Sequence, residues 1–173
     1  MTSTPHAAMN HRKLLLACGN PLRGDDGVGW KIAEALELDP ASASVKVIIT
    51  QQFTPELAED LRDADTVVFV DASATTAAGE VTVVELNPAE AMPRMLTHHM
   101  PPDSLLKLTQ ELYGKLPQRA FAVVVGGESF ELGETLTEAV QAAIPKAVAA
   151  LQDIFAESYR SYLLCRTEQM PKR

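Results

Sequence analysis

The sequence predicts an α/β fold: a single-domain three-layer sandwich with a twisted, mostly parallel five-stranded sheet and helices on both faces. Two observations lead to this prediction. Short apolar or β-branched segments alternate with helical patterns along the chain, which is typical of a parallel sheet covered on both sides. The 173 residues suffice for one core, and 46% of them are hydrophobic against 22% charged. We expect the domain over residues 13–157, between a flexible polar segment at residues 1–12 and a polar tail at residues 158–173.

The five expected strands are short and are bounded by turn-forming residues. They lie at residues 13–18, 45–50, 66–70, 79–86 and 120–125. The first stops at Gly19-Asn20-Pro21, a strong turn signal. The third is apolar on both faces and ends at Asp71, which favours a central strand buried on both sides.

Four helices are expected between or after these strands. They lie near residues 28–39, 55–62, 103–113 and 136–157. The second has Thr54 as a capping residue and Pro55 at its first position. Gly114 is expected to end the third. Pro145 predicts a kink or a break in the last helix, because proline removes a backbone donor.

The composition excludes several classes of function. Fifteen basic against 23 acidic residues give a net charge of -8, which repels phosphate backbones, so we expect no nucleic-acid partner. No segment approaches the roughly 20 apolar residues of a membrane span. The short apolar run near the N-terminus reads as a strand and not as a signal peptide, so we expect a cytoplasmic protein without a membrane partner.

Two aspartates follow neighbouring strands of the predicted sheet. Asp26 lies in the loop after the first strand and Asp71 at the end of the third. Since ligands gather at the carboxyl ends of parallel strands, both are expected at one edge of the sheet. Two readings remain open for each. The Asp25-Asp26 stretch fits a tight turn with a capping aspartate as well as a cation-binding carboxylate, and Asp71 fits a turn or helix cap.

A histidine pair, His98 and His99, lies in a proline-rich connection, whereas His6 and His11 lie in the polar N-terminus. Two carboxylates and one histidine in strand-end loops suit a borderline divalent metal such as nickel or zinc. Cys18 lies within a predicted strand and is interpreted as a small buried hydrophobe. The sequence has neither a Gly-x-Ser-x-Gly elbow nor a His-Glu-x-x-His helix. If the protein is a hydrolase, it is therefore an unconventional one.

Three motifs of the sequence resemble those of the hydrogenase maturation endopeptidases. Residues 16–29 (LACGNPLRGDDGVG) resemble that family's strand–loop–helix signature, and residues 69–72 (FVDA) resemble its second motif. Residues 97–100 (THHM), followed by Leu105 and Leu106, resemble its third. The motifs occur in the family's order, and the likeness spans about residues 13–151.

The resemblance implies an aspartyl or metal-guided endopeptidase that removes the C-terminal extension of a nickel–iron hydrogenase large-subunit precursor after nickel insertion. It places the catalytic and metal-contacting residues at Asp26, Asp71 and His98, where His98 and not His99 is the ligand. The nickel would be carried by the substrate and recognised there, so we expect no tightly bound cofactor in the protein itself, which we expect to be a monomer. Many family members have glutamate in place of Asp26, and often a Gly-Leu pair where this chain has Pro101-Pro102.

Two questions stay open at the level of the sequence. Hydrolysis could proceed through Lewis-acid polarisation or water activation by the metal, or through direct acid–base chemistry of Asp26 and Asp71. The alternative function is a non-catalytic nickel-binding chaperone or a regulatory binding module, because fold alone does not fix activity.

Overall fold

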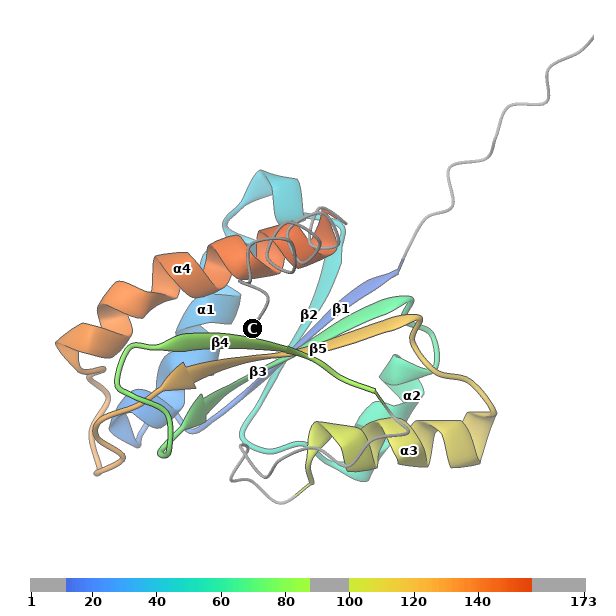
Figure 1. Cartoon of the computed structure of the whole chain (residues 1–173), viewed down its shortest axis with the longest axis horizontal. Coiled ribbons are helices and arrows are strands. Elements are labelled where there is room, and N and C mark those ends of the chain that lie inside the picture. Colours follow the sequence, from blue (N-terminus) through green and yellow to red (C-terminus); the bar gives the residue numbers. More distant parts are fainter. Residues whose placement is uncertain (1–11, 88–99, 157–173) are drawn as a thin grey trace, which may run out of the picture.

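The computed structural model describes residues 12–87 and 100–156 (Figure 1). In this part of the chain five strands form one sheet in the order β2-β1-β3-β5-β4. The strands are β1 (Lys13–Cys18), β2 (Val45–Thr50), β3 (Thr66–Ser73), β4 (Val81–Glu85) and β5 (Arg119–Gly126). All neighbouring pairs are parallel except β4 with β5. The predicted fold class, a mostly parallel five-stranded sheet between helices, is confirmed.

Helices cover both faces of the sheet. They are α1 (Val28–Glu37), α2 (Ala58–Leu61), α3 (Pro102–Tyr113) and α4 (Glu138–Phe155), with short 3-10 turns η1 (Gly24–Gly27), η2 (Pro40–Ser42) and η3 (Pro55–Leu57). Helices α1 and α4 pack together on one face, and α2 and α3 on the other (Figure 1). No helix of the described residues is long and apolar enough to cross a membrane.

The alternation of side chains along the strands divides the core in two. Leu15 and Ala17 of β1 pack in a first cluster with residues of α1 and α4. Leu14, Leu16 and Cys18 point to the other face and pack in a second cluster with residues of α2 and α3. Phe69 of β3 belongs to the second cluster, so Asp71, two residues further on, follows the face that carries Cys18.

Strand β3 is longer than predicted, since it continues to Ser73 instead of ending at Val70. Its ladder with β5 extends through the pairs Asp71–Val124 and Ser73–Gly126. The apolar run ends at Val70, but the backbone pairing does not, because β5 supplies partners for three more residues. Asp71 therefore lies inside a strand and not in the loop after it.

Two helices also differ from the prediction. The first turn of the segment after Thr54 is a 3-10 turn, so α2 itself covers only Ala58–Leu61, and Thr54 makes no side-chain cap bond. Helix α4 begins at Glu138 and passes through Pro145 without a break. Pro145 is exposed, so the backbone bond that it removes lies on the solvent side, while Ala143 and Ala147 are buried against the core. Gly114 ends α3 in a left-handed conformation, as predicted.

Candidate functional site

Asp26 and Asp71 lie at the carboxyl edge of the two central strands β1 and β3. These strands are parallel neighbours with Ala17 opposite Val70, and η1, which contains Asp26, contacts β3. Asp26 is 4% exposed and Asp71 1% exposed. Burying a carboxylate is costly unless polar groups compensate, so two buried carboxylates at one strand edge indicate a functional site.

The loop between β1 and η1 folds back on itself and fixes Asp26. The Asn20 N–H donates to Asp26 Oδ2 at 2.9 Å. Gly19 has φ +137°, and a Cβ there would lie 1.8 Å from the Asp26 carbonyl oxygen, so only glycine fits. The Trp30 Nε1–H of α1 donates to the Gly19 carbonyl at 2.7 Å. The start of the loop is therefore tied both to η1 and to the first turn of α1.

The neighbouring Asp25 has a different role from Asp26. Its side chain is fully buried and accepts four hydrogen bonds from the connection between β5 and α4. The donors are Glu128 N, Ser129 N, Thr137 N and Thr137 Oγ1, at 2.7–3.0 Å. The interpretation of this stretch as a turn with a structural aspartate thus holds for Asp25, and the cation-binding interpretation stays with Asp26.

Hydrogen bonding dominates the acidity of Asp25. Burial by itself raises the pKa of this carboxyl, but the bonds from Ser129, Thr137 and Glu128 outweigh it, and the pKa lies below the ordinary value. Asp25 therefore stabilises the fold at every pH above the ordinary carboxyl range, and this contribution is lost as the pH falls through the lowered pKa.

Asp25→Asn should destabilise the protein at neutral pH. An amide places an NH₂ group where an oxygen now accepts N–H bonds, which leaves buried donors unsatisfied and costs about 3 kcal/mol. Urea unfolding at pH 7 and at pH 3 measures the effect. The difference between wild type and variant should shrink at pH 3, because the stabilisation by Asp25 declines as the pH falls below the ordinary carboxyl pKa towards the lowered one. Equal midpoints at pH 7 would contradict the structural role.

The Asp71 side chain is hydrogen-bonded to the backbone of its own strand. Its Oδ1 accepts from the Ala72 N–H at 2.8 Å. The turn after β3 is organised by Ser73, whose Oγ accepts from the Thr75 N–H at 3.2 Å and from the Thr76 hydroxyl at 3.1 Å. The capping role that the sequence left open for Asp71 is therefore taken by Ser73.

Cys18 belongs to the second core cluster and lies near the Asp26 and Asp71 carboxylates. It is fully buried, as predicted, and its Sγ donates to the Gln51 carbonyl at 3.5 Å. Burial raises the pKa of the Cys18 thiol, and the nearby Asp71 and Asp26 carboxylates raise it further. The thiol stays protonated at neutral pH, which argues against a nucleophilic role.

The third candidate, His98, and its neighbour His99 lie outside the described residues. The chain is described again from Met100, which packs against the second core cluster, the one that contains Cys18. Within residues 12–87 and 100–156, no three side chains of the metal-binding types come together. The described part of the site thus offers two carboxylates, Asp26 and Asp71.

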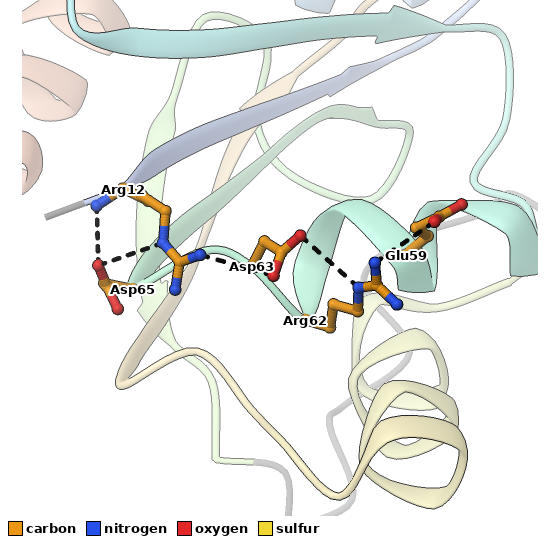
Figure 2. Close-up of polar contacts among 5 residues, drawn as sticks. All are labelled: Arg12, Glu59, Arg62, Asp63 and Asp65. Carbon is orange, nitrogen blue, oxygen red and sulfur yellow. Dashed lines mark hydrogen bonds and ion pairs between the residues drawn. The ribbon is translucent and has the colours of Figure 1, made fainter.

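The opposite, amino edge of the sheet carries a network of ion pairs. Arg12, just before β1, bonds Asp65 and Asp63, and Arg62 bonds Asp63 and Glu59, at 3.5–3.9 Å (Figure 2). Except for Asp65, these side chains line a pocket of about 400 Å³. Exposed pairs of this kind contribute little to stability, and they neutralise one another far along the strands from Asp26 and Asp71.

Comparisons with known proteins agree on one family. The family model described as hydrogenase maturation protease matches residues 31–154, a stretch that contains Asp71 and His98 but leaves out Asp26. The hydrogenase maturating endopeptidase HybD from E. coli is 27% identical, with a TM-score of 0.69 over 85% of this chain and 93% of that one. The [NiFe] hydrogenase maturation protease HybD from Thermococcus kodakarensis, 24% identical, shares the fold with a TM-score of 0.63 over 83% and 98%. No curated protein sequence matches.

Proposed function

The chain belongs to the hydrogenase maturation protease family, and on that premise we propose that it removes the C-terminal extension of a nickel–iron hydrogenase large-subunit precursor after nickel insertion. The observation that carries the proposal is the pair of buried carboxylates, Asp26 and Asp71, at the carboxyl edge of adjacent parallel strands. The motifs around them are those through which the sequence resembles this family.

In this proposal Asp26, Asp71 and His98 contact the nickel that the substrate carries. Carboxylate and imidazole donors suit a borderline divalent metal, and a three-donor site leaves positions for groups of the substrate or for water. The nickel is then the recognition element, and the protein needs no tightly bound metal of its own. The loop around Asp26 is fixed by Asn20 and Trp30 before substrate arrives, which favours a preformed site.

Two chemical routes fit this arrangement. The substrate's nickel can polarise the scissile carbonyl or activate a water molecule, with Asp26 and Asp71 as its ligands. Alternatively, the two carboxylates perform acid–base chemistry directly. Both routes use the same side chains, and both require the carboxylates to lie at one edge, as they do.

Incubation of the purified protein with nickel-loaded precursor tests the function. Mass spectrometry should show a shortened large subunit and a released C-terminal peptide. Precursor that lacks metal, incubated with a chelator, should stay intact, because nickel is the feature that the site recognises. A stable complex without a shortened product would instead support the non-catalytic binding module, and cleavage of metal-free precursor would exclude recognition through nickel.

A further inference from the structure

The peptide unit between Gly19 and Asn20 is hydrogen-bonded on both of its sides. Its carbonyl, that of Gly19, accepts from the Trp30 Nε1–H at 2.7 Å. Its N–H, that of Asn20, donates to Asp26 Oδ2 at 2.9 Å. A trans peptide is planar, and its C=O and N–H point in opposite directions, so the direction of one group fixes that of the other. The indole of Trp30 therefore sets the direction of the N–H that the Asp26 carboxylate accepts.

Glycine at position 19 leaves this peptide unit free to rotate unless other contacts hold it. Gly19 has no Cβ to restrict the dihedral angles on either side of its Cα. Rotation of the peptide plane would turn the Gly19 carbonyl oxygen toward the Asp26 carboxylate, and two oxygen acceptors do not bond each other. The Gly19 N–H is already fixed to β2, because it donates to the Thr50 carbonyl at 3.1 Å. The bond from Trp30 supplies the second restraint, on the carbonyl side of the glycine.

The packing of α1 on the end of β1 brings the Trp30 indole to this peptide. A Cβ at Gly29 would lie 2.3 Å from the Cys18 carbonyl oxygen, so glycine lets the first turn of α1 approach the strand this closely. Trp30 is the next residue of that turn. A hydrogen bond accepted by a peptide carbonyl also polarises the unit and strengthens the bond that its N–H donates. Trp30 thus acts on the Asp26 carboxylate through both the direction and the strength of one hydrogen bond.

We propose that Trp30 is a positioning residue for the processing reaction: it holds the Gly19–Asn20 peptide so that the Asn20 N–H keeps the Asp26 carboxylate in the orientation that acts on the precursor. The inference rests on the proposed function, because it takes Asp26 as a group of the reaction. A group that is oriented before the substrate binds saves the reorganisation that would otherwise add to the barrier. Loss of the indole N–H should therefore slow the reaction more than it weakens the binding of precursor.

The chain has a single tryptophan, so the indole N–H can be removed while the shape of the ring is kept. Expression with benzothienylalanine in place of tryptophan puts a sulfur atom where Trp30 has its N–H and changes no other position. The kcat for nickel-loaded precursor should fall about tenfold, with KM within about threefold of wild type, since Asp71 and His98 of the proposed site are unchanged. Trp30→Phe also lacks the donor and should give the same result.

Hydrogen exchange of the Asn20 amide, followed by NMR, tests the same bond without any precursor. In the protein with benzothienylalanine this amide should exchange about tenfold faster than in wild type, because its bond to Asp26 is held less firmly. Thr109→Val is the matched control. It removes a buried hydroxyl that donates to the Leu105 carbonyl at 2.8 Å in α3, and it should leave kcat and the exchange of Asn20 at their wild-type values.

The outcomes separate this proposal from the proposed function. If wild type shortens the precursor and the protein with benzothienylalanine does so with unchanged kcat, the role of Trp30 is wrong and the endopeptidase stands. If wild type leaves the precursor intact, the endopeptidase is wrong, whereas faster exchange of Asn20 would still support the hold of Trp30 on the peptide. A loss of kcat in Trp30→Phe alone would assign the effect to ring size, and an equal loss in Thr109→Val would assign it to stability. Either result would overturn the proposal.

Discussion

Asp26→Asn and Asp71→Asn are each expected to abolish processing of nickel-loaded precursor, with a loss of at least about a thousandfold, or roughly 4 kcal/mol in the barrier. Each substitution removes a negative charge that the proposed site directs at the metal, while the shape of the side chain is kept. The Asn side chain at position 26 retains an oxygen that can accept the Asn20 N–H, so the loop should still form. Mass analysis of the precursor over time measures the rate.

Two further variants make this result interpretable. Asp63→Asn removes a carboxylate at the amino edge of the sheet, within the ion-pair network of Figure 2, and should process at the wild-type rate. Asp26→Glu restores the charge with the residue that many family members carry, and should process faster than Asp26→Asn. Wild-type rates in either Asn variant would remove that residue from the site. Loss of the circular dichroism signal would assign it a structural role.

His98→Gln is expected to abolish processing, whereas His99→Gln should keep most of it. In the family pattern the ligand precedes the paired leucines of the next helix by seven and eight residues, which leads from Leu105 and Leu106 back to His98. The two leucines from which the count starts have the expected place in the structure. Both are fully buried in α3 and pack in the cluster that contains Cys18.

The same precursor assay measures both histidine variants, and each serves as the control for the other. Adjacent residues of an extended segment point to opposite sides, so one substitution should be silent. Loss in His99→Gln alone would move the ligand to His99. Equal loss in both would mean that both histidines serve the site, and wild-type rates in both would remove histidine from it.

Local sequence patterns predict most of this fold, because turn-forming residues mark the ends of its strands. Strands β1 and β2 have the predicted bounds, and in each an apolar or β-branched run coincides with the ladder. The prediction of strand bounds fails where backbone pairing continues beyond the apolar residues. In β3 the last three residues belong to the strand because β5 pairs with them. Of the predicted kink or break at Pro145, the break is wrong: α4 continues through Pro145, and Ala143 and Ala147 on either side of it are buried against the core.

In the candidate site, too, some residues could be predicted from the sequence and others could not. The rule for parallel strands leads from the sequence alone to Asp26 and Asp71 at one edge, and the structure places both there. The role of Asp25 has no local signal, since its partners Glu128 and Thr137 lie more than 100 residues further along the chain. The contact between the loop at Leu22 and the connection at Gly133 has no local signal for the same reason, because the two segments meet only in the folded chain.

The loop that begins at Gly19 has a length that its contacts do not allow to vary. Gly19 lies against the Asp26 carbonyl, and Gly29 lies so near the Cys18 carbonyl that a Cβ would come within 2.3 Å of it. Between these two glycines, Asp25 accepts bonds from the connection between β5 and α4, and Asp26 accepts a bond from Asn20. One inserted residue before Asp25 would put Asp25 in the place of Asp26 at the site. The connection between β5 and α4 would then lose the carboxylate that it bonds. Any loop grafted here from a relative must therefore replace residues one for one, whereas changes in loop length have to be accommodated elsewhere in the chain.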